Sequence, residues 1–304
     1  MSTTYIAGYD GSDASRAALR FVTQLASAAG GEVLAASVYI RAARSFGKGA
    51  ADGPVVALDE QSRADAEQVL AKGGVPDVMW CVVGAGSPAE GLHRLAEDQS
   101  AAILAVGVTH RGALGRLVPG SVGEHLLHGA PCPVAVVPAD FAEGPVRTVA
   151  VAYDDSEESQ VALRAGEDLA RRLGARLLVL AVGEGSVTYA VAPGMPYMTG
   201  ELLDELEQRM KQDTQQVVDA LSSEVDTDVR VLTGPAGGAL VAACADEVDV
   251  LVTGSRGYGP ARSVLLGSVS RHVIDHAPCP VIVVPRAASA DGPAEPAEPA
   301  NAKA

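Results

Sequence analysis

The chain has 304 residues, of which 48% are hydrophobic and 20% are charged, and its net charge is −15. The length favours two domains of ordinary size, and the composition is typical of a globular protein. The excess of acidic side chains argues against nucleic acid or an anionic membrane surface as a partner, since both would be repelled.

The N-terminal residues predict no targeting segment. Residues 1–7 have neither a basic region nor a long apolar region of the kind found in signal peptides. Apolar runs such as residues 101–108 are too short to span a bilayer. The four cysteines are Cys81, Cys132, Cys244 and Cys279, and no two of them form a Cys-x-x-Cys pair. Cys132 and Cys279 are repeat equivalents, and we interpret them as small buried thiols at strand starts in preference to a redox role. We therefore expect a cytoplasmic protein with no membrane segment.

In the first half, short apolar segments alternate with segments of helical periodicity. The expected strands are Tyr5–Tyr9, Val33–Tyr39, Val78–Val83, Ile103–Val108 and Val134–Val137. The expected helices are Ser12–Ala29, with Ser12 as its cap, Leu58–Ala71, Pro88–Glu97 and Ser121–His128. The strands are apolar without alternation, which is typical of a parallel sheet buried on both faces.

The second half repeats this alternation after a linker at residues 139–146. The expected strands are Thr148–Tyr153, Leu177–Val182, Val229–Leu232, Val250–Thr253 and Val281–Val284. The expected helices begin near Ser156, Thr199, Ala236 and Ser268. Residues 287–304 are rich in Ala, Pro and Glu, and we expect them to be a disordered tail.

Both halves end in nearly the same segment. Residues 120–138 and 267–285 correspond at a constant offset of 147 residues (267 − 120 and 285 − 138). A repeat of this length is that of a whole domain, so the chain is predicted to be a duplicated domain with halves 1–138 and 147–286. In an open α/β sheet of this kind, ligands bind beyond the carboxyl ends of the strands.

A glycine-rich segment follows the fourth expected strand of the second half. Gly254 and Gly257 are followed, after nine residues, by Gly267 and Ser268 at the start of a helix. Glycines let the backbone approach a ligand closely, and the free N–H groups at a helix start favour phosphate. The hydroxyls of Ser268 and Ser270 would add donors. The alternative interpretation of these glycines is a tight turn with no ligand.

This pattern resembles the ATP-binding motif Gly-x2-Gly-x9-Gly-Ser/Thr of the universal stress protein family, which residues 254–268 match in full. The resemblance extends to Tyr-Asp10-Gly-Ser and Tyr-Asp154-Asp-Ser after the first strands and to the closing Ala-Pro-Cys-Pro-Val-x-Val-Val-Pro of each half. It covers residues 3–138 and 147–285. Asp10 and Asp154 are also open to interpretation as helix caps.

The resemblance implies a fold and a function. The fold is two tandem doubly wound parallel five-stranded sheets with helices on both faces, in strand order 3-2-1-4-5, like that of the adenine nucleotide α-hydrolases. The function is binding of an adenine nucleotide, ATP with or without Mg²⁺, in stress survival or dormancy. Dimerisation through the fifth strands is also implied, either as a homodimer or as a pseudo-dimer of the two halves.

The family's nucleotide-binding positions carry over to both halves. In the second half they are Ala152, Asp154, Val182, Gly254, Arg256, Gly257, Gly267, Ser268, Val269 and Ser270. In the first half they are Gly8, Asp10, Val38, Gly107, Gly112, Gly120, Ser121 and Val122.

Each half departs from the motif at one position. His110 stands where the second glycine is expected, and a non-glycine residue at positive φ is uncommon. In the second half, Asp155 replaces Gly11 and adds negative charge that a divalent cation would offset. The sequence therefore predicts two nucleotide sites and ranks that of the second half first.

No catalytic or metal-binding set stands out in the sequence. The lysines lie outside the glycine-rich segments, and no Ser–His–Asp set is visible. Because phosphoryl transfer needs a positioned cation, we favour a nucleotide-binding regulatory protein that hydrolyses ATP slowly at most. Two alternatives stay open: a slow ATPase or nucleotidyl-transfer enzyme on the same fold, and a stress scaffold that works without nucleotide. The regulatory protein partner is not identified by the sequence.

Overall fold

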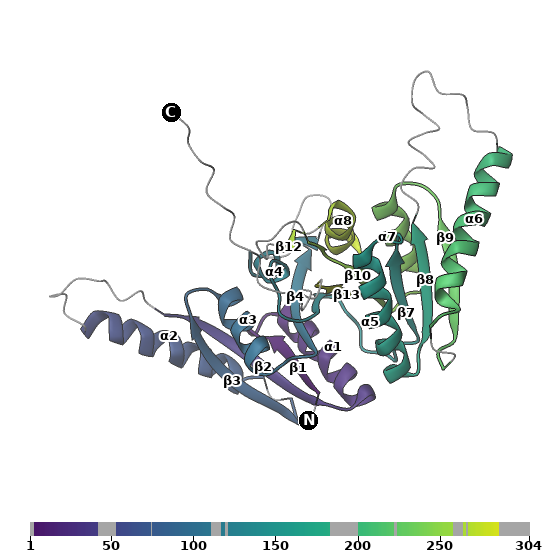
Figure 1. Ribbon diagram of the computed structural model, residues 1–304. Helices are drawn as coiled ribbons and strands as arrows, with labels where there is room; N and C mark the ends of the chain where they lie inside the picture. The colour runs from purple at the N-terminus through teal and green to yellow at the C-terminus, as the bar shows by residue number, and fades with distance from the viewer. Residues whose placement is uncertain are drawn as a thin grey trace, which may run out of the picture.

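The structure is a computed structural model, shown in Figure 1. It describes residues 3–41, 53–73, 75–110, 117–118, 121–182, 200–221, 224–257, 264–265 and 267–285. The expected disordered tail at 287–304 lies outside these residues.

The first half contains the predicted alternation of strands and helices. Its elements are β1 Thr4–Gly8, α1 Asp13–Ala29, β2 Glu32–Ile40, α2 Gly53–Ala71, β3 Val78–Ala85, α3 Pro88–Asp98, β4 Ile103–His110, β5 Leu117–Val118, α4 Ser121–Leu127 and β6 Val134–Pro138. Helix α2 begins five residues before the predicted start at Leu58, and the short strand β5 was not predicted.

The second half repeats this order. Its elements are β7 Thr148–Tyr153, α5 Glu157–Leu173, β8 Arg176–Val182, α6 Gly200–Val218, β9 Thr227–Leu232, α7 Ala236–Asp246, β10 Val250–Gly254, β11 Arg256–Gly257, β12 Val264–Leu265, α8 Ser268–His276 and β13 Val281–Val284. Helix α5 ends at Leu173, and its C-cap Gly174 has a φ of 61°, the left-handed conformation that commonly stops a helix.

The strands of both halves form one sheet. Its order is β3-β2-β1-β4-β6-β13-β10-β7-β8-β9, with β5 attached to β4. Within each half the long strands pair in parallel in the predicted order 3-2-1-4-5. Between the halves, β6 and β13 pair antiparallel. The two predicted five-stranded sheets are thus joined into one through their fifth strands, which would otherwise be bare apolar edges and which pair here within the chain.

Two hydrophobic cores cover the two faces of this sheet, and each runs through both halves. One core includes Phe21 and Leu25 of α1 with Leu163 and Leu169 of α5, and these two helices lie against each other. The other core lies under the helices that carry Leu92, Leu126, Leu240 and Ile274. Helices α4 and α8 lie on the same side of the sheet near the junction (Figure 1). This packing makes the two halves one body at the sheet centre.

Equivalent residues meet at the junction. Ala135 in β6 lies opposite Ile282 in β13, which is its counterpart at the 147-residue offset. An approximate two-fold axis therefore passes through this pair. Near it, Arg271 of α8 donates a hydrogen bond to Glu124 of α4, and these positions are also counterparts (271 − 124 = 147). At the axis of a dimer of identical chains, this position would face the same residue of the second chain. Because the two halves of this chain have diverged, the position can carry opposite charges on its two sides.

We expect charge reversal at this pair to weaken the junction. Glu124→Arg would place like charges together and lower the free energy of unfolding by about 1 kcal/mol, because both side chains are partly exposed. The swap Glu124→Arg with Arg271→Glu would recover part of this loss; Asp275, 3.6 Å from Arg271, keeps the recovery incomplete. A double-mutant cycle by chemical denaturation measures the coupling. Single-variant losses that simply add would contradict this expectation.

Candidate functional site

Each half has the same hydrogen-bonded loop after its first strand. Asp154 Oδ1 accepts hydrogen bonds from the backbone N–H of Ser156 at 3.2 Å and from its hydroxyl at 2.5 Å. Ser156 Oγ accepts from the backbone N–H of Ser159 at 3.2 Å and so caps α5. In the first half, Asp10 Oδ1 accepts from the N–H of Ser12 at 3.0 Å, and Ser12 caps α1. The serine is therefore the cap, and the aspartate holds the serine.

These hydrogen bonds change the acidity of Asp10. Burial acts to raise the pKa of its carboxyl, but hydrogen bonds from the side chain and backbone of Ser12, the side chain of Ser15 and the backbone of Asp10 together outweigh burial and lower the pKa below its usual value. A carboxyl whose pKa is lower in the folded state stabilises the protein above its unfolded pKa. That contribution is lost as the pH falls through the folded pKa.

We therefore expect Asp10→Asn to destabilise the protein at pH 7 and to have less effect in acid. The difference in free energy of unfolding between wild type and variant should be constant above about pH 5 and should shrink below about pH 4. Chemical denaturation at a series of pH values measures it. A difference that does not change between pH 7 and pH 3 would show that the Asp10 charge is not involved.

The residue after the aspartate has positive φ in both halves. Gly11 has a φ of 79°, and Asp155 has a φ of 63°. Aspartate is among the residues that tolerate this region, at more cost than glycine. The hydroxyl of Tyr153 donates to Asp155 Oδ1 at 2.8 Å, and burial together with this hydrogen bond raises the pKa of Tyr153. The carboxylate of Asp155 is thus engaged by its neighbour.

The first glycine of each motif lies against the first turn of a helix. A Cβ on Gly254 would come within 2.5 Å of the backbone O of Glu158 in α5. On Gly107 it would come within 1.9 Å of the backbone O of Ala14 in α1. Both distances are too short for any side chain, so these two glycines are required for the helix to pack on the strand end.

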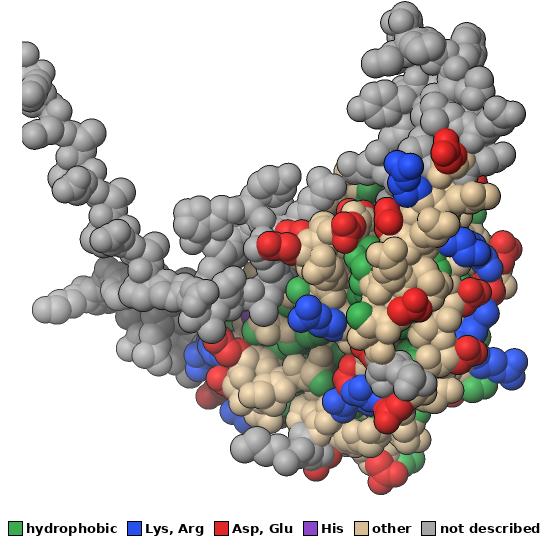
Figure 2. All heavy atoms as spheres, turned by 45° about the vertical axis from the view of Figure 1, so that its right-hand side comes forward, with side chains coloured by type: hydrophobic (Ala, Val, Ile, Leu, Met, Phe, Trp, Pro, Cys, Tyr) green, Lys and Arg blue, Asp and Glu red, His purple; other side chains and the backbone are tan. Residues whose placement is uncertain are grey.

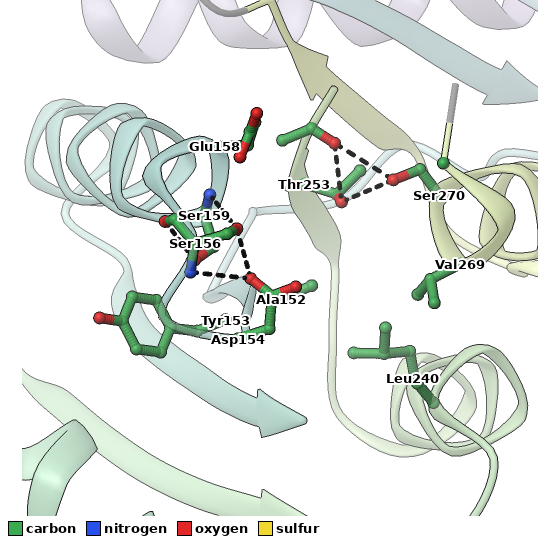
Figure 3. A pocket seen from close by; sticks show the side chains of 13 residues that line it. Ala152, Tyr153, Asp154, Ser156, Glu158, Ser159, Leu240, Thr253, Val269 and Ser270 are labelled. Atoms are coloured by element: carbon green, nitrogen blue, oxygen red, sulfur yellow. Dashed lines mark hydrogen bonds between the residues drawn. The ribbon is translucent and has the colours of Figure 1, made fainter. Parts of the chain in front are cut away.

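Helix α8 begins at the same end of the sheet. Its N-cap is Gly267, whose φ of −63° and ψ of 156° are extended, and no side chain caps the first turn. Ser270 Oγ donates to the backbone O of Gly254 at 3.1 Å and lies 3.2 Å from Thr253 Oγ1, so the first turn is tied to β10 (Figure 3). The N–H groups of this turn thus face outward from a helix start without a side-chain cap.

A pocket lies between these parts, where β7 and β10 end. It measures about 550 Å³ including its open mouth. Figure 3 shows Asp154, Ser156 and Ser159 on one side and Val269 and Leu240 on the other. The lining residues are Ala152, Tyr153, Asp154, Ser156, Glu158, Ser159, Ala236, Leu240, Thr253, Gly254, Gly267, Val269 and Ser270. The pocket therefore has an apolar wall from α7 and α8 and a polar wall from the α5 loop.

The structure brings six of the ten predicted residues of this half to the pocket. They are Ala152, Asp154, Gly254, Gly267, Val269 and Ser270. The other four lie outside its lining: Val182 ends β8 opposite Leu232, Arg256 and Gly257 form β11, and Ser268 is the first residue of α8. The pocket is also lined by side chains that were not predicted as site residues, among them Ser156, Ser159, Leu240 and Thr253.

The segment after β10 is a short hairpin. Gly257 of β11 pairs antiparallel with Val264 of β12. In the first half, His110 pairs with Leu117 in the same register. Both positions lie in strands, so the backbone does not require glycine there, and the concern that His110 would need positive φ is removed.

The first half places its predicted residues at the corresponding strand ends. Gly8 ends β1, Asp10 follows it, Val38 lies in β2 and Gly107 in β4; Ser121 and Val122 begin α4. Gly112 and Gly120 lie outside the described residues. By offset, Val106 and Gly123 stand where the second half has Thr253 and Ser270. The hydrogen bonds that the Ser270 hydroxyl makes between α8 and β10 therefore have no counterpart between α4 and β4.

The described residues hold no group of three His, Cys, Asp or Glu side chains that could bind a metal. None of the described helices combines the length and the apolarity that crossing a bilayer requires. On the face shown in Figure 2, acidic and basic side chains are interspersed over the second half, and the basic ones do not gather into a patch.

Comparisons with known proteins agree with this architecture. The model of the universal stress protein family matches the chain twice, at residues 1–138 and 145–285. A universal stress protein of Thermus aquaticus is 35% identical over 139 residues, which are 45% of this chain and 98% of that protein. One of Mycobacterium tuberculosis is 32% identical over 194 residues, or 61% of this chain and 62% of that protein. The crystal structure of a universal stress protein from Archaeoglobus fulgidus superposes with a TM-score of 0.67 at 22% sequence identity. The superposition covers 94% of this chain and 99% of the Archaeoglobus chain.

Proposed function

We propose that the second half of this chain, which belongs to the universal stress protein family and has one family domain in each half, binds an adenine nucleotide. ATP is the expected form, and the protein is proposed to act as a nucleotide-binding regulator in stress survival or dormancy. The observation that carries the proposal is the pocket between the Asp154 loop, the end of β10 and the uncapped start of α8.

The chemistry of the pocket suits such a ligand. Ala152, Leu240 and Val269 provide an apolar wall for a flat base. Asp154 would accept a hydrogen bond from a ribose hydroxyl. The uncapped N–H groups after Gly267 would bind phosphate, as helix starts do. The glycine leaves this start open to close approach.

Negative charge at the pocket bears on how ATP would bind. Asp154 and Glu158 line it, and no lysine or arginine is among the described lining residues. A triphosphate would therefore be held more tightly with Mg²⁺, which would neutralise part of its charge. The same lack of cationic side chains favours binding over turnover, because phosphoryl transfer depends on positive charge at the transferred group.

The pairing of β6 with β13 bears on assembly. Each of these strands would otherwise be a bare apolar edge of its half, and the pairing covers both edges within one chain. We propose that the chain works as its own pair and needs no second copy at this face. Size-exclusion chromatography with light scattering would show a monomer, and a dimer lost on weakening β13 would overturn this.

The test of the proposed function is the nucleotide content of the purified protein. The protein is denatured, the released nucleotide is identified by mass spectrometry, and its amount per chain is measured. Titration calorimetry of the stripped protein with ATP and AMP, with and without Mg²⁺, gives affinity and stoichiometry. We expect an adenine nucleotide and at least one site per chain.

Two results would overturn the proposal in different directions. No released nucleotide, together with no thermal shift on adding ATP, would favour a scaffold that works without nucleotide. Hydrolysis of ATP at about one turnover per second, abolished by Gly267→Val, would favour an enzyme on the same fold.

A further inference from the structure

The two sides of the approximate two-fold axis are not covered alike. On one side, the linker between the halves lies over α1. The ring of Phe141 packs edge-on against that of Phe21, with centroids 5.5 Å apart. Arg20 donates to the backbone O of Phe141 at 3.3 Å, and the N–H of Gly144 donates to Gln24 Oε1 at 3.3 Å. The linker therefore seals this side with an aromatic pair.

The counterpart side lacks both rings. Helix α5 corresponds to α1 at an offset of 144 residues, as the caps Ser12 and Ser156 show, so Ala165 stands where the first half has Phe21. At the 147-residue offset of the closing segments, the counterpart of Phe141 is Ala288. Residues 286–304 contain no aromatic residue and no Leu, Ile, Val or Met. The segment that follows β13 thus offers no large apolar side chain to take the place of the missing rings.

A pocket occupies this counterpart position. It measures about 960 Å³ including its open mouth, and its walls include Tyr5, Ile103, Ala165, Leu169, Ile282 and Val284. These walls come from both halves, across the β6–β13 junction.

The wall residues are less covered than their counterparts under the linker. Ile103 is 7% exposed and its counterpart Val250 is 0% exposed; Val284 is 6% exposed and Val137 is 0% exposed. The pocket is therefore the space that an aromatic pair fills on the opposite side of the axis.

A group of three charged side chains lies at the rim of this pocket. Asp168 and Arg172 line the pocket next to Tyr5 and form an ion pair at 2.6 Å. Arg171 of the same helix, which is outside the lining, also binds Asp168. Because one carboxylate is shared by two guanidinium groups, the three side chains together carry a net positive charge of one. This charge favours an anionic group beside an aromatic one.

We propose that this pocket is a second ligand site, separate from the nucleotide pocket, that binds a small aromatic acid. The ring would lie on Ala165 and Leu169, in the space equivalent to that of the Phe21–Phe141 pair, and the acid group would pair with Arg172. Because the walls of the site come from both halves, its ligand would hold the two halves together.

The test uses 2-naphthoate as the probe, with 2-naphthalenemethanol as its uncharged analogue, in titration calorimetry of the full chain. We expect a Kd of order 0.1 mM for the naphthoate. Ala165→Phe, which restores the missing ring, should weaken binding at least tenfold. Gln160→Phe, which adds the same ring at an exposed position of α5, should leave binding unchanged. Arg172→Gln should weaken naphthoate about fivefold and the alcohol hardly at all.

Several results would overturn this proposal. Naphthoate that binds wild type and Ala165→Phe equally, or that is displaced by ATP, does not occupy this pocket. Ala165→Leu serves as a second variant in case the larger ring disturbs folding, and thermal melting confirms that each variant is folded. A wild-type dimer that Ala165→Phe converts to a monomer would assign the face to a second copy of the chain and not to a small molecule.

Discussion

Replacing Gly107 with alanine is expected to lower the free energy of unfolding by about 3 kcal/mol or more. The added Cβ would lie 1.9 Å from the backbone O of Ala14, and the atom it meets is backbone, which cannot rotate away as a side chain can. Gly254→Ala brings its Cβ to 2.5 Å from the backbone O of Glu158, so its effect should be somewhat smaller. Chemical denaturation of the two variants measures both losses.

Gly238 provides the matched control. It lies within α7, and nothing stands within 4 Å of a Cβ built on it. Gly238→Ala should therefore stabilise the protein by about 0.5–1 kcal/mol, because alanine loses less backbone entropy than glycine in a helix. If all three variants changed stability alike, the steric argument for Gly107 and Gly254 would fail.

This expectation affects how the glycine motif is interpreted. Gly254 lines the pocket, yet its lack of a side chain is already explained by α5. A variant at Gly254 that lost nucleotide binding would not separate contact with phosphate from loss of packing. Gly267 is the better probe, because its conformation is one that any residue adopts.

Much of the fold could be predicted from the sequence. Unalternating apolar strands required a sheet buried on both faces, and the repeated closing segment required two copies of one domain. The start of α2 was misplaced because its first residues, Gly-Pro-Val-Val-Ala, show no helical periodicity. The hairpin strands β5, β11 and β12 have two residues each, too short for any alternation to be visible.

The candidate site could be predicted only in part. Spacing along the chain pointed to Gly254 and Gly267, which belong to the motif, and the hydroxyl of Ser270, two residues beyond the motif, was predicted as a further donor. The partnership of Thr253 with Ser270 joins residues 17 apart through the packing of α8 on β10, and no periodicity carries that information. Likewise, the role of Gly107 depends on how closely α1 approaches β4, a distance that exists only in the folded chain.

Replacing Gly267 with valine is expected to weaken ATP binding by at least about 100-fold while the chain stays folded. The backbone at Gly267 is extended, with a negative φ, so valine fits without backbone strain. Its two methyl groups would cover the first N–H groups of α8, where the phosphates are proposed to bind. As valine is a poorer N-cap than glycine, a loss of stability of about 1 kcal/mol should accompany the change.

Titration calorimetry with ATP measures the affinity of this variant, and thermal melting checks its fold. Gly267→Ala is the graded control, since a single methyl group should weaken binding less than two. Binding of ATP by Gly267→Val with wild-type affinity and stoichiometry would mean that the nucleotide does not use the start of α8.

The matching substitution in the first half, Gly120→Val, separates the two sites. If each half binds ATP, each variant should lose one equivalent per chain and keep the other. If only the second half binds, Gly267→Val should remove all binding and Gly120→Val none. The structure favours unequal sites, because the Thr253–Ser270 pair that ties α8 to β10 is replaced in the first half by Val106 and Gly123. Val106 and Gly123 have no hydroxyl with which to make the corresponding hydrogen bonds, so we expect the N–H groups at the start of α4 to be less firmly positioned for phosphate.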